Sequence, residues 1–583
     1  MSSPESSSDE SSGTITEQTH RDIEAQDPPK KLSYWHRQFD LAGVTPAVRE
    51  WRYKGSGIAE DPFIVDFLPE DPKNPMKFAV WKKWGITGLQ AIAVLAVTFV
   101  STAYSGGIGE VIREFQVGEE IAILGVSLFV LGFAVGPLLW APLSEMYGRQ
   151  LLFFITYGCL TAFNAGAAGS QNIWTLIILR FFAGTIGSSP LTNSGGVIAD
   201  MFTAKDRGLA TAIFATAPFL GPSIGPIAGG FLGTAGGWRW VEGLMAAYTG
   251  LLWFICTFLV PETYAPILLR RRAEKLSELT GKVYVSKLDA GKPKKTVAQE
   301  FKISLSRPWI LLFREPIVLL TSLYMAIVYG TLYMMFAAFP IVYQQNRGWS
   351  AGVGGLAFLG IAVGMIVAVS YSIWDNTRYA KTMAAHGGNA PAEARLPPAL
   401  VGSVLLPVGL FWFAWTCGPN IHWIVSIVAS GFFATGLVLV FLSLMNYMID
   451  SYVIYAASVL AANSVLRSIF GAAFPLFTTA MYHNLGIHWA SSIPAFLALA
   501  CLPFPFLFYK YGASIRMKCK FAAEAAKVLE TMRTRNDHDG PPPGGPLPGK
   551  LQQQKQHEDE KLGGKSGEES NRERGTETET ETE

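Results

Sequence analysis

The chain has 583 residues, half of them hydrophobic and only 16% charged, with a formal net charge of +2. Soluble proteins have about 25% charged residues. The deficit is concentrated, because residues 81–260 and 316–511 hold only 25 of the Asp, Glu, Lys and Arg residues. This segregation excludes a soluble multidomain protein, and the small net charge gives no indication of nucleic-acid binding.

The two apolar blocks are long enough for twelve membrane-spanning helices. A helix needs roughly 20 residues to cross the hydrocarbon core, and long apolar runs disfavour a β-barrel. We predict an all-α membrane protein with 12 transmembrane helices in two six-helix pseudo-symmetric halves. The expected spans are 84–104, 121–141, 150–168, 173–197, 209–232, 240–260, 316–342, 353–373, 399–416, 421–444, 453–480 and 488–510.

Polar segments divide the chain into five parts. The expected parts are a disordered cytoplasmic N-tail with an interfacial anchor (1–80), a first six-helix half (81–260), a cytoplasmic central loop (261–315), a second six-helix half (316–511) and a disordered cytoplasmic C-tail (512–583). Basic residues in short loops favour the cytoplasmic side. Arg149, Lys205 and Arg207 lie in loops on the same side as both tails, so we expect both termini in the cytoplasm.

The chain contains no sequence typical of an enzyme. No phosphate-binding loop of the form GxxxxGK[ST] is present, and the five cysteines show no metal-ligand spacing. We therefore predict that the protein is not an enzyme, and that it needs no cofactor and no metal. A membrane protein without an ATPase motif is expected to be a secondary transporter or a channel, and no filter-like repeat indicates a channel.

A short loop after the second expected span is the first functional candidate. In WAPLSEMYGRQLLF, Glu145 and Arg149 are four residues apart, and Gly148 permits a sharp bend between them. The alternative is an ordinary surface salt bridge. Asp375 and Arg378, in YSIWDNTRYAK, hold the corresponding place six spans later. Such a repeat is typical of two-half transporters.

Two arginines lie inside expected spans. Arg180 is about seven residues inside the fourth span, and Arg467 is about fourteen residues inside the eleventh. An arginine in the membrane usually faces a partner or a water-filled cavity. Snorkelling to the interface is the alternative for Arg180 and is harder for Arg467.

The fifth expected span reads ATAPFLGPSIGPIAGGFL. Its small residues and prolines recur at four-residue spacing, which places them along one helix face. Close helix packing explains this pattern and does not conflict with a role in gating. The residues are Gly221, Pro222, Gly225, Pro226, Gly229 and Gly230.

These features together resemble the major facilitator superfamily, and in particular the fungal 12-span drug:proton antiporter family of multidrug and polyamine-type exporters. The resemblance covers about 70–515. The string APLSEMYGRQ is similar to the superfamily loop motif GxLaDrxGRR, although it departs from that motif at Ala141, Met146 and Gln150. LRFFAG resembles the fourth-span motif whose arginine is linked to proton coupling, and GPSIGPIAGG resembles the antiporter motif of the fifth span.

The resemblance implies proton-coupled efflux of amphipathic organic compounds, such as drugs, fungicides and toxic metabolites, by alternating access. Glu145, Arg149, Asp375 and Arg378 would then act as gating residues, and Arg180 and Arg467 are the coupling candidates. The expected proton carrier is missing, because Glu145, Asp200, Glu242 and Asp450 all fall near expected span ends. An arginine cannot replace it, since it does not lose its proton.

The substrate cavity is expected to be large and mostly apolar. Its candidate lining residues are Gln90, Asn193, Tyr329, Tyr333, Phe432, Phe433 and Asn463. The scarcity of acids argues against a dedicated polyamine or organic-cation exporter, although that function stays open. A self-protection exporter of one endogenous secondary metabolite, an uptake permease and a non-transporting membrane sensor also stay open.

The expected partners are a small-molecule substrate, protons and the lipid bilayer, with no nucleic acid. The protein is expected to be a monomer in the plasma membrane, with the vacuolar membrane as a second possible location.

Overall fold

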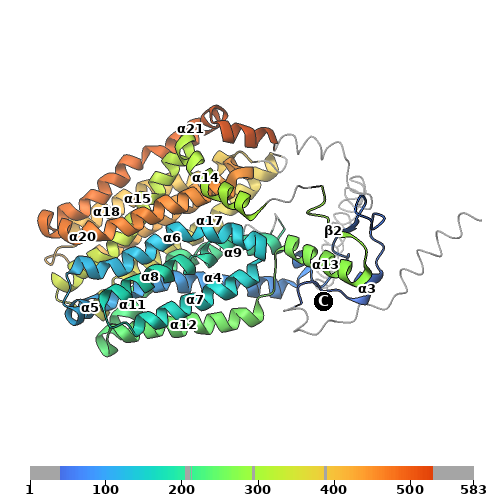
Figure 1. Ribbon diagram of the computed structural model, residues 1–583. Coiled ribbons are helices and arrows are strands. Elements are labelled where there is room, and N and C mark those ends of the chain that lie inside the picture. The colour runs from blue at the N-terminus through green and yellow to red at the C-terminus, as the bar shows by residue number, and fades with distance from the viewer. Residues whose placement is uncertain are drawn as a thin grey trace, which may run out of the picture. The chain divides into compact units, whose positions relative to one another are not determined.

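A computed structural model describes residues 40–528, except 204–205, 207–209, 212, 292–295 and 387–389. Long helices make up almost all of the described chain (Figure 1). Within that part, one short pair of parallel strands, β1 (Phe63–Val65) and β2 (Tyr284–Ser286), is the only sheet. The protein is therefore all-α in architecture, as the sequence predicts.

The first six expected spans correspond to the helices between residues 80 and 259. They are α4 (Val80–Ala103), α6 (Glu119–Tyr147), α7 (Arg149–Ala168), α8 (Ile173–Gly187) continued by α9 (Ser189–Met201), α11 (Ala217–Gly236) and α12 (Trp238–Leu259). A 3-10 turn, η2 (Tyr104–Gly107), and the short helix α5 (Ile108–Phe115) extend α4. The fourth span changes helix at Ser188, directly before Ser189 and Pro190, where proline suits the first turn of a helix.

The last six expected spans correspond to the helices between residues 316 and 518. They are α15 (Pro316–Phe339) with the π-helical η3 (Pro340–Gln345), α16 (Ala351–Leu356) with α17 (Phe358–Ala385), α18 (Pro397–Thr416), α19 (Trp423–Ser451), α20 (Ala456–Cys501) and α21 (Pro503–Lys518). The 3-10 turns η4 (Ala392–Arg395) and η5 (Val453–Tyr455) precede α18 and α20. The helix α20 contains two spans, because Gly486 breaks it with a φ of 72°.

Ten helical segments of the described chain are long and apolar enough to cross a membrane. They become twelve when α20 is divided at Gly486 and the glycine- and proline-rich α11 is added. One boundary prediction is wrong, because the eighth span does not end at 373. The helix α17 continues to Ala385, and Asp375 and Arg378 lie on its last turns instead of in a loop. Nothing in SIWDNTRYAKTMAA stops a helix, since glycine and proline come later.

Helices that are neighbours in the bundle approach closely at small residues. The helix α11 packs on α4, and a Cβ added to Gly229 would lie 2.0 Å from the carbonyl oxygen of Ala103. Gly230 faces α16, where an added Cβ would lie 2.5 Å from the oxygen of Ala351. The first and last six spans also meet where α6 packs on α20. The small-residue pattern of α11 therefore serves two close contacts.

Residues 40–78 and 261–290 form a small structure that we name the folded layer. It contains α3 (Pro46–Glu50), η1 (Pro75–Lys77), α13 (Ala265–Thr280) and the β1–β2 pair, around a core that includes Val48, Val65 and Leu276. A second helix of the central segment, α14 (Val297–Arg314), packs on α20. The expectation of a disordered tail over 1–80 is wrong for residues 40–79, because the central segment supplies the apolar partners that the tail lacks alone. Residues 1–39 and 529–583 lie outside the described residues.

Candidate functional site

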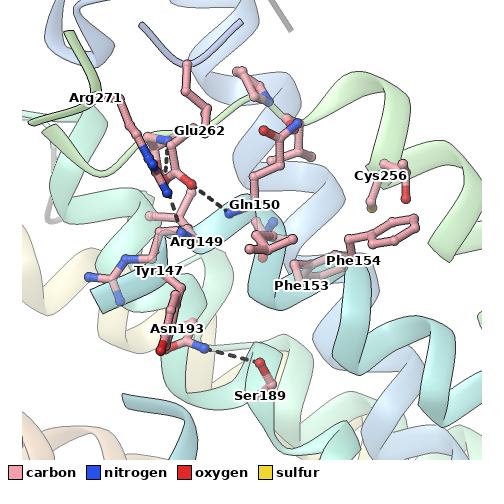
Figure 2. Close-up of a pocket in the computed structure, with 18 residues that line it drawn as sticks. Tyr147, Arg149, Gln150, Phe153, Phe154, Ser189, Asn193, Cys256, Glu262 and Arg271 are labelled. Atoms are coloured by element: carbon pink, nitrogen blue, oxygen red, sulfur yellow. Dashed lines mark hydrogen bonds between the residues drawn. The ribbon is translucent and has the colours of Figure 1, made fainter. Parts of the chain in front are cut away.

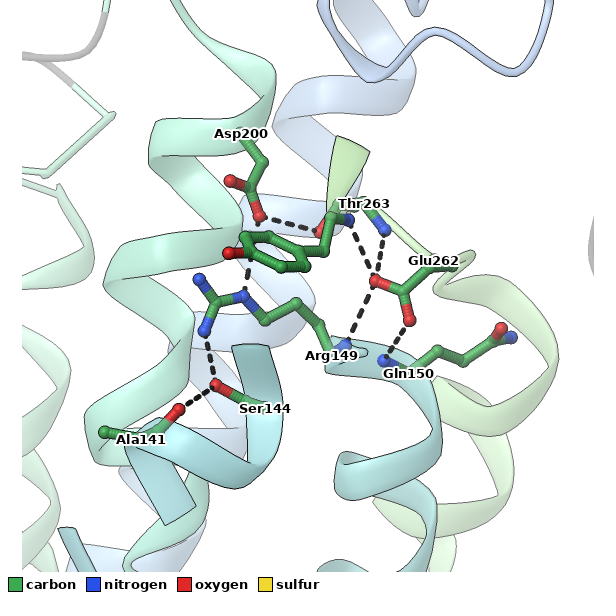
Figure 3. Close-up of polar contacts among 8 residues, drawn as sticks. Ala141, Ser144, Arg149, Gln150, Asp200, Glu262 and Thr263 are labelled. Atoms are coloured by element: carbon green, nitrogen blue, oxygen red, sulfur yellow. Dashed lines mark hydrogen bonds and ion pairs between the residues drawn. The ribbon is translucent and has the colours of Figure 1, made fainter. Parts of the chain in front are cut away.

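The turn between α6 and α7 has a conformation that requires glycine. Gly148 has a φ of 99°, and a Cβ at this position would lie 2.3 Å from Oε2 of Glu262. The carboxylate of Glu262 accepts hydrogen bonds from the backbone N–H groups of Arg149 and Gln150, each at 3.0 Å (Figure 3). These amides begin α7, so Glu262 caps the helix and interacts favourably with its dipole.

The side chain of Arg149 joins three segments. Its Nη1 donates to Oγ of Ser144 at 2.6 Å, and its Nε lies 3.6 Å from Oδ2 of Asp200, at the end of α9. The guanidinium also lies over the ring of Tyr264, 4.9 Å from its centroid. Burial raises the pKa of the Tyr264 phenol to about 12, so this ring stays neutral. Arg149 therefore forms its ion pair with Asp200. The sequence spacing predicts a pair with Glu145, which is exposed.

A matching cluster lies in the last six spans. Arg395 precedes α18 as Arg149 begins α7, and its Nε lies 2.9 Å from Oδ2 of Asp450, near the end of α19. The hydroxyl of Tyr379 donates to the same oxygen at 3.2 Å. Asp375 and Arg378 form a separate two-bond ion pair within α17, with distances of 2.6 and 3.1 Å. By position, the counterpart of Arg149–Asp200 is therefore Arg395–Asp450, and the predicted match of Arg378 with Arg149 is wrong. The predicted match of Asp375 with Glu145 stays a prediction, since both residues lie on the last turns of their helices.

Arg180 forms a fully buried ion pair. Its Nη1 lies 2.8 Å from Oε1 of Glu242, and both side chains are 0% exposed. It also donates to the carbonyl oxygens of Gly125 and Val100, at 2.8 and 3.1 Å. The guanidinium lies over the ring of Tyr104, with a centroid distance of 4.4 Å. Snorkelling is thus excluded for Arg180, which links α8 to α12, α6 and α4.

Sequence reasoning missed the partner of Arg180, although a signal was present. Glu242 is the fifth residue of α12 and Arg180 is the eighth residue of α8. Both helices begin at the same end of the bundle, so the two residues lie at similar depth. Glu262 and Asp200 were missed as partners of Arg149 for another reason. They are far from it in sequence, and only the packing of α7 against α12 and α9 brings them together.

A cavity of about 300 Å³ lies next to this turn, between α4, α7, α9 and α12 (Figure 2). Its lining includes the predicted residues Gln90 and Asn193 together with Phe153, Phe154 and Cys256. Oγ of Ser194 donates to Oε1 of Gln90 at 2.6 Å, and Nδ2 of Asn193 donates to Oγ of Ser189 at 3.1 Å. These two candidates therefore lie inside the first six spans.

The other predicted cavity residues fall into two groups. The rings of Tyr329 and Tyr333 are 5.0 Å apart, and the Tyr333 hydroxyl is 3.0 Å from Oγ of Ser101, which joins α15 to α4. Nδ2 of Asn463 donates to the sulfur of Met325 at 3.3 Å. These three residues lie between packed helices, and Tyr333 also lines a second cavity of about 290 Å³ together with Phe336 and Pro475.

Phe432 and Phe433 do not belong with them. Phe432 is 41% exposed on the outer surface beside Trp412, and Phe433 is buried where α19 meets Gly409 of α18. A residue on α19 moves to another face with each step of about 100°, which separates these two neighbours. The prediction that both line the cavity is wrong.

Together these observations define a polytopic membrane protein with two sets of six spans, a charged cluster at one end of each set and no clustered metal ligands in the described residues. Residues 90–475 match the family model described as Major Facilitator Superfamily. The chain belongs to this superfamily, and it is a transporter and not an enzyme.

Three similar curated relatives come from fungi. The chain is 64% identical over 512 residues to the "Major facilitator superfamily multidrug transporter mdrA" of Aspergillus fumigatus, covering 87% of this chain and 84% of that protein. It is 63% identical over 508 residues to the "MFS-type efflux pump MFS2" of Trichophyton rubrum, covering 87% and 85%. It is 58% identical over 506 residues to the "Efflux pump FUB11" of Gibberella moniliformis, also covering 87% and 85%.

A solved structure supports the fold. The partially occluded inward-open xylose transporter XylE of E. coli matches with a TM-score of 0.52 and 16% identity, covering 74% of this chain and 98% of that chain. At this sequence identity, the structural similarity supports a shared fold only.

Proposed function

We propose that the protein is a proton-coupled exporter of amphipathic organic compounds that works by alternating access. The main support is sequence identity over 87% of the chain with two named proteins. It is 64% with a protein named as a multidrug transporter and 63% with one named as an efflux pump. The expected substrates are drugs, fungicides and toxic metabolites.

The charged clusters provide a mechanism for gating. Arg149–Asp200 and Arg395–Asp450 tie helix ends together at the same end of the bundle, one cluster in each set of spans. In this proposal the halves 81–260 and 316–511 move as units, and these clusters hold the ends of each unit together. Glu145, Gly148 and Arg149 form the gating loop, and Asp375 and Arg378 support the second cluster from α17.

Proton coupling is assigned to the buried pair in the first half. Arg180 keeps its charge at all relevant pH values, so its partner Glu242 is the group that would exchange a proton. Oε1 of Glu242 faces Arg180, and within the described chain its buried Oε2 has no hydrogen-bond partner. A proton added at Oε2 would weaken the attraction between α8 and α12, which couples protonation to helix packing.

The proposed orientation follows the charge distribution. Arg270, Arg271 and Arg272 belong to the folded layer, and basic residues near spans favour the cytoplasmic side. We place the layer and both termini in the cytoplasm. The protein is proposed to be a monomer in the plasma membrane, surrounded by lipid, with the vacuolar membrane as the second possible location.

The test is transport by Arg149→Ala in a yeast host that lacks its own multidrug exporters. Cellular accumulation of a panel of azoles and other amphipathic compounds should fall when the wild type is expressed, and it should return to the vector level with Arg149→Ala. Surface biotinylation checks that the variant reaches the membrane, and Arg314→Ala, at an exposed arginine, is the control. Normal efflux by Arg149→Ala at a normal surface level would contradict the gating role.

Proteoliposomes test the coupling separately. An imposed pH gradient should drive substrate movement by the wild type, and an uncoupler should abolish it. Transport that is unaffected by the pH gradient and by the uncoupler would contradict proton antiport and would indicate facilitated export.

A further inference from the structure

Arg467 lies in the middle of the bundle and has no carboxylate partner in the part of the chain that the structure describes. It is the twelfth residue of α20, so it lies about 17 Å along the helix at 1.5 Å per residue. This is about half the thickness of the hydrocarbon core. Its Nε is buried and has no hydrogen-bond partner, and no ion pair of Arg467 occurs among residues of the described ranges.

Several buried or half-buried arginines differ from Arg467 in this respect, whereas the half-buried Arg307 and Arg347 likewise have no carboxylate partner among the described residues. Arg180 and Arg395 each have a carboxylate oxygen within 2.9 Å, and Arg149 has one at 3.6 Å. Arg272 forms an ion pair with Asp71. An unpaired charge that is removed from water is costly, so a ligand that supplies an acceptor to Arg467 would be stabilised there.

Two aromatic rings of the last six spans lie beside this guanidinium. It lies 5.2 Å from the ring centroid of Tyr329 on α15 and 5.3 Å from that of Phe441 on α19. Phe441 in turn contacts Phe219 of α11, with ring centroids 4.9 Å apart. Gly471, one turn after Arg467, approaches both Tyr329 and Val130 of α6. Arg467 therefore lies where the two sets meet and away from the lipid.

The site has the chemistry of an anion receptor with an aromatic wall. The two rings stabilise the cation through their π faces but supply no hydrogen-bond acceptor for its N–H groups. Arg467 is half-buried as a residue, so part of it remains accessible. A carboxylate can take two parallel N–H···O bonds from a guanidinium, and the rings can pack against an aromatic or other planar scaffold.

We propose that Arg467 recognises an acidic group of the transported compound, and that the preferred substrates are amphipathic organic anions, above all aromatic carboxylates. This inference rests on the proposed export function and deepens it by naming the substrate class. Neutral compounds can use the aromatic wall alone and bind more weakly. Cationic compounds meet a like charge at the same place.

The test uses three compounds that share one aromatic scaffold and are negatively charged, neutral and positively charged. Full-length protein in detergent micelles is titrated with naphthoate, naphthamide and naphthylmethylammonium, and binding is followed by calorimetry. The wild type should bind the carboxylate at least about tenfold more tightly than the amide, the range of one charge-assisted hydrogen bond. The ammonium compound should bind most weakly.

Variants then assign the preference to one side chain. Arg467→Gln should make the carboxylate and the amide bind equally, while Arg467→Lys should retain part of the preference. Arg314→Gln, which removes an exposed positive charge at the end of α14, should leave the ranking unchanged. If Arg467→Gln does not fold, the ranking of the three ligands by the wild type and by Arg467→Lys still decides the question.

The outcomes separate the two proposals. Equal binding of carboxylate and amide by the wild type, or an unchanged preference in folded Arg467→Gln, would overturn the anion site even where cells export neutral compounds. Wild-type cells that export no compound of either charge would instead contradict the proposed function.

Discussion

The buried pair of Arg180 and Glu242 leads to an asymmetric prediction about stability. Glu242→Leu leaves an arginine that cannot lose its proton, whereas Arg180→Met leaves a carboxylate that can become neutral by protonation. We expect Glu242→Leu to lower the free energy of unfolding by about 3–5 kcal/mol and Arg180→Met by less. The double variant should recover most of the loss, because it removes both charges from an interior where both are 0% exposed.

Thermal unfolding in detergent, followed by tryptophan fluorescence, measures these differences. A double variant as unstable as Glu242→Leu would show that shape, and not charge pairing, determines stability at this position.

The residues that matter individually were only partly predictable from the sequence. Gly148 and Arg149 were found because a glycine and a charge interrupt an apolar run. Glu262 was not predicted, since its role depends on where α12 ends relative to α7. The distinction between Phe432 and Phe433 depends on the rotation of α19, which an apolar span without a polar face does not reveal.

At the scale of helices, α11 should tolerate very little change where it crosses α4. Gly229→Ala places a methyl group about where the Ala103 carbonyl oxygen lies, so the helices must separate. We expect a loss of about 1–3 kcal/mol from overpacking and a smaller yield of monodisperse protein in size-exclusion chromatography. The control is Gly243→Ala in α12, where no heavy atom lies within 4 Å and alanine should be neutral or slightly stabilising. Equal behaviour of the two variants would show that α4 and α11 adapt freely.

The helices themselves were the most predictable part of the protein. Hydropathy alone indicated twelve spans, because the bilayer requires about 20 apolar residues in each one. The errors in the predicted helix ends occurred outside the bilayer, where the membrane thickness does not limit the length of a helix. The helix α17 extends into polar sequence up to Ala385, and α21 continues to Lys518. Hydrophobic periodicity does not mark ends of this kind, and only a helix-stopping residue would.

At the scale of the whole molecule, the folded layer joins two distant parts of the chain. Asp71 precedes the first span and Arg272 follows the sixth. Their buried ion pair therefore joins the segment before the first six spans to the segment after them. The Nε of Arg272 also donates to the carbonyl oxygen of Ala42 at 3.1 Å. A polar tail without an apolar pattern of its own gave no sign of this pairing, because α13 supplies the other half of the core around Val48 and Val65. The layer thereby restricts how the start of α4 and the segment after α12 can move relative to each other.

The layer should become more stable as the pH rises from about 8 to 10. Burial lowers the pKa of Lys73 from its ordinary value of 10.5 to about 8, so between these values the unfolded layer binds more protons than the folded one. Stability therefore increases with pH in this window and is independent of this group below it. Tyr53, whose pKa burial raises to about 12, stays protonated in both states until about pH 10, above which it opposes the trend. Hydrogen exchange at the β1 and β2 amides, corrected for the intrinsic pH dependence of exchange, should show growing protection from pH 8 to 10. Lys73→Met should remove that dependence, and a persistent increase in the variant would mean that another group titrates.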